Sequence, residues 1–256
     1  MASTSRKQRN QDYFDKTAAD YDTKHEKTLN QLIDKIRARL DFIGVNWIDD
    51  EHDTGDVNPD QATVKLLDYA CGPGTISRAL APYTTQCVGI DLSENMVAAY
   101  NMRAGNQGLA PDEMHAYQGD LCNPSDPSPV ALSAPSFFDF DIAAVGLGLH
   151  HFDDPALAAK RLVERLRPGG VLLIIDFLPH QADHVRGHGC ELDKEHSQAM
   201  ATVTHHGFSP ETIRAIFDGA GAGIDFAMDE CADTISGPRD GGSFKRKIFL
   251  ARGAKT

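Results

Sequence analysis

The sequence of this 256-residue chain predicts an α/β fold, in which helices cover both faces of a doubly wound, mostly parallel sheet of seven strands. Three observations predict it. Short apolar runs alternate with segments of helical periodicity from residue 64 onward. The run at 171–175 is apolar throughout, which is typical of a strand buried on both faces. A turn that contains two glycines, at 70–74, separates the first of these runs from the helical segment that follows it.

The expected elements follow in order along the chain. Residues 27–43 carry apolar side chains at intervals of three and four, which predicts a helix. Residues 13–22 are expected to be irregular or weakly helical. Strands are predicted at 64–69, 86–91, 115–118, 140–145, 171–176, 224–228 and 244–251, and helices at 75–80, 93–104, 155–166 and 210–219. Ser93 is the expected N-cap of the helix at 93–104.

Charge divides the chain into two expected parts. Residues 41–60 hold seven acidic residues and no Lys or Arg, a pattern typical of a solvated loop. We therefore expect an N-terminal helical cap and acidic linker at 1–60, and a ligand-binding domain at 61–256. Within that domain, the segment between the fifth strand and the next helix, at about 179–207, is expected to be a lid insertion.

Composition excludes several classes of function. The formal net charge of -12 argues against nucleic acid as substrate, because phosphate backbones are bound by clustered Lys and Arg. The sequence has no apolar run long enough to span a membrane, and its first residues do not form a secretory signal. The five cysteines are scattered, as in proteins of a reducing compartment. We expect a cytoplasmic protein.

A glycine-containing turn follows the first predicted strand, in the segment Asp68-Tyr69-Ala70-Cys71-Gly72-Pro73-Gly74. Glycine lets the backbone approach a ligand, and the start of the next helix presents free N–H groups. Asp91 ends the second strand, where a carboxylate can accept hydrogen bonds from ribose hydroxyls. A plain tight turn with a helix-capping Asp91 fits the same residues, and nicotinamide-dependent dehydrogenases share the pattern.

The motifs, taken in order, resemble those of class I S-adenosylmethionine (SAM)-dependent methyltransferases. Segments similar to five family motifs lie at 66–75, 88–96, 118–121, 140–152 and 166–170. Residues 13–22 also resemble the N-terminal segment of the ubiquinone/menaquinone C-methyltransferase-like branch. The resemblance implies a Rossmann-like fold, SAM as cofactor, and methyl transfer to an O, N, S or C atom of a small molecule.

The resemblance also implies roles for the matching residues. Those expected around the methionine part of SAM are Ala70, Gly72, Pro73, Gly74, Val145 and Gly146. Those expected at the ribose and adenine are Asp91 for the ribose hydroxyls, Leu92 and Met96 for the ring, and Asp120 and the Leu121 backbone for its polar edge. Asp68 is expected to order the glycine turn, and Tyr21 to lie over the cofactor as part of a lid.

Histidines supply the candidate catalytic bases. His150 and His151 follow the fourth strand on the expected substrate side, and histidine titrates near neutral pH. His205 and His206 are the corresponding candidates in the predicted lid. Each of the four also fits a purely structural role. Three lid histidines at intervals of four have a spacing that can bind zinc, but glycines interrupt the helix it requires, so no metal is expected.

Several functions therefore remain open at the level of the sequence. The favoured one is a SAM-dependent methyltransferase with a small-molecule acceptor. A protein methyltransferase, a non-catalytic module that keeps the cofactor pocket, and an NAD(P)-dependent reductase are the alternatives. A protein partner is possible but nothing in the sequence indicates one.

Overall fold

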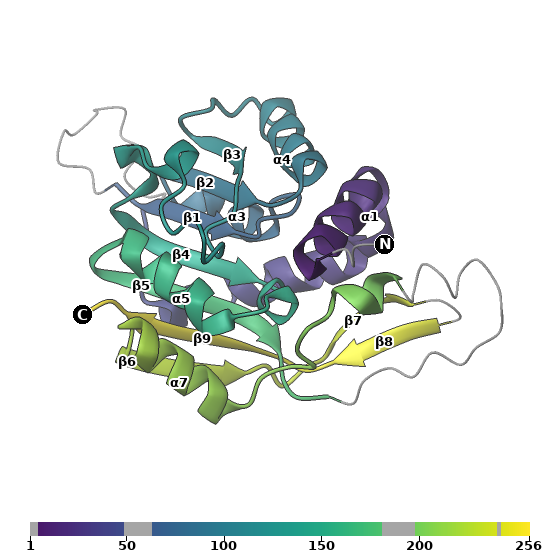
Figure 1. Cartoon of the computed structure of the whole chain (residues 1–256). Coiled ribbons are helices and arrows are strands. Elements are labelled where there is room, and N and C mark those ends of the chain that lie inside the picture. Colours follow the sequence, from purple (N-terminus) through teal and green to yellow (C-terminus); the bar gives the residue numbers. More distant parts are fainter. Residues whose placement is uncertain (1–4, 49–62, 181–197, 240–241) are drawn as a thin grey trace.

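The computed structural model describes residues 5–48, 63–180, 198–239 and 242–256. A seven-stranded sheet runs through the centre of the molecule, with the strand order β3-β2-β1-β4-β5-β9-β6 (Figure 1). The strands are β1 (Lys65–Tyr69), β2 (Gln86–Asp91), β3 (Met114–Gln118), β4 (Phe140–Gly146), β5 (Leu166–Phe177), β6 (Ile224–Glu230) and β9 (Ile248–Ala254). Strands β1 to β5 pair in parallel, and β9 pairs antiparallel with both β5 and β6. The predicted doubly wound, mostly parallel sheet is confirmed.

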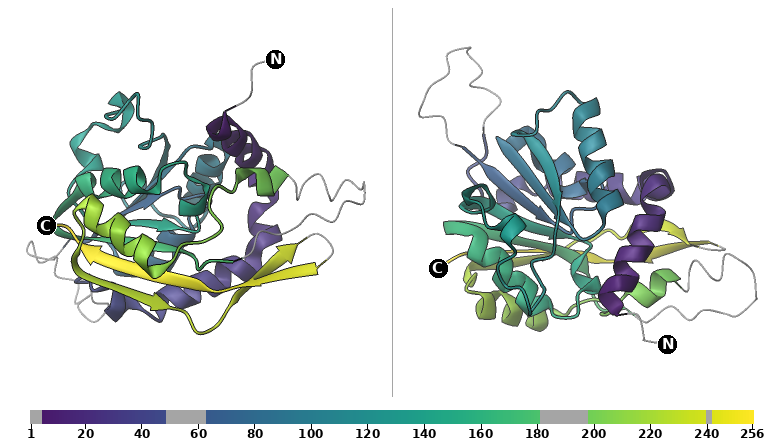
Figure 2. Two further views of the ribbon diagram at one scale, coloured as in Figure 1. Left: turned by 60° about the horizontal axis from the view of Figure 1, so that its bottom comes forward. Right: turned by 45° about the horizontal axis from the view of Figure 1, so that its top comes forward.

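Helices cover both faces of this sheet (Figures 1 and 2). They are α1 (Arg6–Arg37), α2 (Leu40–Ile43), α3 (Thr75–Leu80), α4 (Glu94–Asn106), α5 (Pro155–Arg165) and α7 (Pro210–Ala220). Side chains of α5 and α7 bury one face, and side chains of α1, α3 and α4 bury the other. Among the described residues, no helix is both long enough and apolar enough to cross a membrane.

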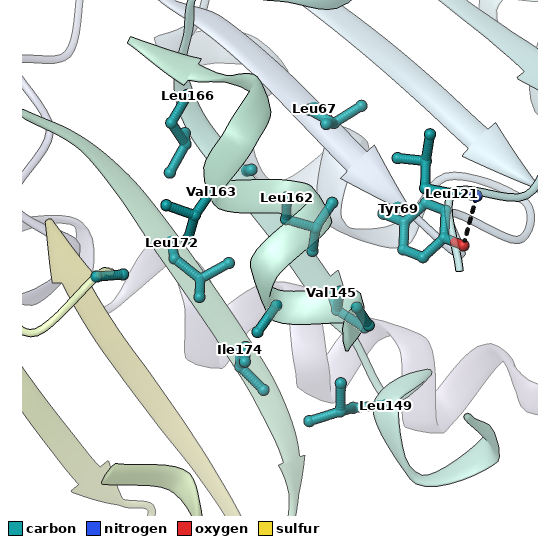
Figure 3. Packing of buried hydrophobic residues seen from close by; sticks show 14 of the residues in the cluster. Leu67, Tyr69, Leu121, Val145, Leu149, Leu162, Val163, Leu166, Leu172 and Ile174 are labelled. Atoms are coloured by element: carbon teal, nitrogen blue, oxygen red, sulfur yellow. Dashed lines mark hydrogen bonds between the residues drawn. The ribbon is translucent and has the colours of Figure 1, made fainter. Parts of the chain in front are cut away.

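The core follows from the period-two alternation of the strands. In β1 the neighbouring residues Leu66 and Leu67 are both fully buried but belong to clusters on opposite faces. Figure 3 shows the cluster of Leu67, in which Leu162 of α5 lies over the sheet. A strand buried on both faces can be apolar throughout, which explains the apolar run in β5.

The N-terminal segment differs from the sequence prediction. Residues 13–22 are part of one regular helix, α1, with Ser5 as its N-cap. Tertiary contacts hold this polar stretch in place: the Ser93 hydroxyl and the Asn95 N–H both donate to the Asp15 carboxylate. The C-terminal half of α1 adds Leu32 and Ile36 to the core cluster of the α3 face. The predicted boundary at residue 60 falls outside the described residues.

A second difference lies near the C-terminus. The predicted strand at 244–251 is interrupted at Lys247, so that β8 (Gly242–Arg246) precedes β9. Strand β8 pairs with β7 (Ile235–Arg239) in a separate two-stranded sheet that the sequence reading missed. The hairpin packs on α1, where the Thr28 hydroxyl donates to the Ser236 carbonyl and the Ser236 N–H donates to Gln31. Most of the predicted lid, residues 181–197, lies outside the described residues.

Candidate active site

A cavity of about 410 Å³ opens at the carboxyl ends of β1, β2 and β4. From β1 the chain continues to β2 and β3 on one side of the sheet, whereas from β4 it continues to β5 on the other side. The boundary between β1 and β4 is therefore the topological switch point, where open α/β sheets bind ligands. The N-terminal half of α1 covers the cavity and contributes Lys7, Asn10, Phe14 and Tyr21 to its lining.

The cavity brings together most of the residues that the sequence predicts to bind the cofactor. Predicted site residues that line it are Tyr21, Ala70, Gly72, Pro73, Asp91, Leu92, Met96, Asp120, Gly146 and His151. Predicted site residues outside its lining are Asp68, Gly74, Leu121, Val145, His150, His205 and His206.

The turn after β1 is built from left-handed residues. Ala70, Gly72 and Gly74 have φ values of 53°, 50° and 90°. A Cβ atom at Gly74 would lie 2.8 Å from the Tyr100 ring, so this glycine serves the packing of α4 rather than the cavity. A Cβ atom at Gly72 would meet no described atom within 4 Å. Gly72 therefore leaves room that a ligand can fill.

This difference gives a matched pair of variants, Gly72→Ala and Gly108→Ala. Gly108 also has a positive φ (77°) and open space at its Cβ, but it lies outside the cavity lining. Left-handed strain should lower the free energy of unfolding by about 1–2 kcal/mol in both variants. We expect the Gly72→Ala variant to weaken binding of S-adenosylhomocysteine (SAH) about tenfold or more, equivalent to about 1.4 kcal/mol, by titration calorimetry. Equal binding by the two variants would contradict a ligand at Gly72.

Asp68 is buried below the turn and is 1% exposed. Its Oδ2 accepts hydrogen bonds from the Ser77 N–H (3.0 Å) and the Ser77 hydroxyl (2.8 Å). The Tyr100 hydroxyl donates in turn to Ser77 Oγ. Burial raises the pKa of Asp68 to about 7, against the Ser77 bonds, which lower it. Asp68 thus ties the turn's helix, α3, to β1 and has no place in the cavity lining.

Asp91 links the first two strands. Its Oδ2 accepts from the Gly72 N–H and its Oδ1 from the Ser93 N–H, both at 2.8 Å. Burial raises the pKa of Asp91, and these backbone bonds lower it. A carboxylate has about four lone-pair sites, so the two oxygens can still accept bonds from a ligand. Asp91 therefore shapes the turn and lines the cavity as well.

Asp120 follows β3, the neighbour of β2, and forms an ion pair with Lys7 of α1 (Nζ–Oδ2 2.6 Å). The Cys122 N–H and the Tyr69 hydroxyl donate to its other oxygen. The Leu121 N–H, predicted to face the cofactor, donates instead to the Tyr69 hydroxyl (3.1 Å; Figure 3). This differs from the prediction, and the reason is that the Tyr69 side chain fills the space beside Leu121.

Of the α1 residues that line the cavity, the sequence analysis predicted only Tyr21. Burial raises the pKa of Tyr21 from its ordinary value of 10 to about 12, which keeps the hydroxyl neutral well above pH 7. Lys7 and Asn10 also line the cavity, and the Asn10 side-chain N–H donates to the His151 carbonyl. The sequence pattern does not predict a site role for Lys7 and Asn10, because their partners lie on loops that follow distant strands.

The two histidines after β4 differ in position. His151 lines the cavity and contacts the Phe14 ring, with 5.3 Å between centroids. Its Nδ1–H donates to the Thr202 carbonyl (3.0 Å), which leaves Nε2 as an acceptor. Burial, together with the neighbouring His150, lowers the pKa of His151 to about 3. His150 lies behind it, buried and bonded to Asp176 through Nδ1 (2.8 Å).

The histidines predicted in the lid lie away from the cavity lining. The His205 ring is bonded to the Phe152 carbonyl through Nε2 and packs on Phe208. His206 is exposed and contacts the His180 ring. Of the three lid histidines whose spacing can bind zinc, His184 and His188 fall outside the described residues. Within the described ranges, no three His, Cys, Asp or Glu side chains are grouped as metal ligands.

Comparison with known proteins identifies the domain. A family model described as a methyltransferase domain matches residues 67–174, which contain the glycine turn, Asp91, Asp120 and His151. An uncharacterized methyltransferase of Schizosaccharomyces pombe is 30% identical over 161 residues, which are 61% of this chain and 52% of that protein. A demethylmenaquinone methyltransferase of Clavibacter sepedonicus is 32% identical over 117 residues, 44% of this chain and 41% of that protein. The matches thus span about half the length of these relatives or less.

Solved structures agree at the level of the fold. Magnesium protoporphyrin IX methyltransferase from Synechocystis PCC 6803, with bound SAM, has a TM-score of 0.61 at 16% identity, with 100% of both chains covered. The predicted Rossmann-like fold is confirmed. Residues 67–174 of this chain match the methyltransferase domain model, in agreement with the resemblance seen in the order of the motifs.

Proposed function

We propose that this protein transfers the methyl group of SAM to a small-molecule acceptor. The observation that carries the proposal is the convergence of Gly72, Asp91 and Asp120 on one cavity at the sheet's switch point, within the segment that matches the methyltransferase domain. The names of relatives support a small acceptor, since demethylmenaquinone and ubiquinone biosynthesis enzymes are among them.

The residues present fit the cofactor. Gly72 leaves the space that a methionine chain needs, and Asp91 has lone pairs for the ribose hydroxyls. Leu92 and Met96 offer apolar contact for the adenine. SAM supplies an activated methyl group when bound, so the chain has to align an acceptor and keep water away. The α1 cover serves the second requirement.

The charge of the cavity lining favours a neutral or cationic acceptor. The described lining contains one Lys or Arg side chain, Lys7, and this is paired with Asp120. Asp91, Asp153 and Asp154 add further acids to the same lining. A phosphate or carboxylate on the acceptor would lack a cationic partner there, and burying an unpaired anion is costly.

Location and partners are proposals of the same kind. Cys71, Cys87, Cys122 and Cys231 are unpaired thiols, as is usual in a reducing compartment. We propose the cytoplasm as the location. The net charge of -12 supports a small molecule rather than nucleic acid as the acceptor.

Titration calorimetry tests the proposed cofactor. SAM and SAH should bind with dissociation constants on the order of micromolar or tighter, and NAD(H) and NADP(H) should give no heat. Mass spectrometry of a metabolite extract incubated with methyl-labelled SAM should then show a labelled small molecule. Binding of a nicotinamide cofactor without any response to SAM or SAH would overturn the proposal.

A further inference from the structure

A buried carboxylate at the end of β5 has no role in the site described so far. Asp176 is 0% exposed, and it accepts three hydrogen bonds. Two come from His150, one from its backbone N–H (3.0 Å) and one from its ring Nδ1 (2.8 Å). The third comes from the Phe177 N–H (2.7 Å). A buried carboxylate costs free energy unless it is bonded in this way, so Asp176 fixes both the backbone and the ring of His150.

His150 in turn fixes the segment that enters α7. Its carbonyl accepts from the backbone N–H groups of Thr204 (2.9 Å) and His205 (3.0 Å). The same segment presents the Thr202 carbonyl to Nδ1 of His151 at 3.0 Å. The rings of His150 and His151 also lie against each other, with 4.1 Å between centroids. A continuous set of hydrogen bonds and ring contacts thus connects Asp176 to a histidine that lines the cavity.

We propose that Asp176 is a positioning residue for His151: through His150 and the Thr202 carbonyl, it fixes the Nδ1–H tautomer and directs Nε2 to accept a hydrogen bond from the methyl acceptor. The acceptor group is then one with an O–H or N–H donor, such as a hydroxyl or an amine. The proposal rests on the methyltransferase function proposed above, whose cavity supplies the place for that group.

The electrostatics of the cluster agree with orientation by a neutral ring. His151 keeps its proton on Nδ1 because the Thr202 carbonyl can only accept. The pKa of His151, lowered to about 3 mainly by burial, keeps the ring uncharged at pH 7. A neutral imidazole with an unprotonated Nε2 can accept a hydrogen bond from the O–H or N–H group of the methyl acceptor. This bond orients the lone pair of that group, while the proton stays on the methyl acceptor. The neighbouring Phe14 ring adds no competing charge.

Nitrogen-15 NMR of the histidine rings tests the tautomer directly. The His151→Gln variant assigns the His151 signal as the one that it loses. In the wild-type protein we expect protonated Nδ1 and unprotonated Nε2 at pH 7. The backbone N–H and the ring N–H of His150 donate to different oxygens of Asp176. The Asp176→Asn side chain has only one acceptor oxygen, so one of these two bonds is lost and His150 is held less firmly. The His151 signals should then show a mixture of tautomers.

A control variant at a second buried carboxylate distinguishes a specific effect of Asp176 on His151 from the general effect of removing a buried charge. Asp141 is also buried, but it lies at the opposite end of β4, where it accepts from the Lys65 N–H and pairs with Arg167. The Asp141→Asn variant should leave the His151 tautomer unchanged. SAH binding, measured by calorimetry on each protein, should remain in both variants, because neither residue lines the cavity.

Two outcomes would overturn the inference. One is a wild-type protein in which Nε2 of His151 carries the proton, a result that needs no variant and holds even if Asp176→Asn does not fold. The other is a folded Asp176→Asn protein with the His151 tautomer of the wild type. Absence of SAH binding by the wild-type protein would instead overturn the proposed function, so the two failures are distinguishable.

Discussion

Replacement of Asp91 by Ala is expected to weaken binding of SAM and SAH by about 2–4 kcal/mol, taking about 1.5–2 kcal/mol for each charge-assisted bond to a ribose hydroxyl. Asp91 ends β2 and lines the cavity, with both oxygens already held by the backbone N–H groups of Gly72 and Ser93. The variant loses the ribose acceptor and also the bond that shapes the glycine turn. Titration calorimetry with SAH measures the effect.

The control for this variant is Asp112→Ala, which removes an exposed acid outside the cavity. It should bind SAH like the wild type. If Asp91 serves only the start of α4, the Asp91→Ala protein will lose about 1 kcal/mol of unfolding free energy and bind SAH normally. That result would remove Asp91 from the cofactor site.

Much of the sheet and of the cofactor wall could be predicted because the relevant signals are local. The apolar run of β5 and the turn Ala70–Gly74 each lie within a few consecutive residues, and their meaning does not depend on distant contacts. The N-cap role of Ser93 was predicted for the same reason, and its hydroxyl does accept from the Met96 N–H. The fold and the resemblance to the methyltransferase domain could therefore be recognised from the sequence.

The cover and the histidine assignments depend on distant contacts instead. The start of α1 is polar and lacks a continuous apolar stripe, and its helical form is supported by partners such as Asp120 and Ser93, which come much later in the chain. His150 and His151 are adjacent and chemically identical, and they share one 3₁₀ turn. Successive residues in such a turn point about 120° apart, so the sequence cannot tell which of them reaches the cavity.

The pH dependence of stability should reveal the buried carboxyl of Asp68. Its pKa is about 7 in the folded protein and 3.8 as the ordinary value, so the folded state holds a proton that the unfolded state loses between these pH values. Stability then falls as the pH rises through this window, by about 4 kcal/mol at most from this group. Above pH 7 both states are ionised, and the contribution becomes constant.

The Asp68→Asn variant isolates this effect, because an amide resembles the protonated carboxyl and does not titrate. Urea unfolding at pH 4, 5, 6, 7 and 8 should show that the wild type loses stability relative to the variant as the pH rises. The Ser77→Ala variant sharpens the test. The Ser77 hydroxyl lowers the pKa of Asp68, so its removal should raise that pKa and extend the falling limb to higher pH. Parallel profiles for the wild type and Asp68→Asn would show that the pKa of Asp68 is not raised in the folded protein, despite its burial.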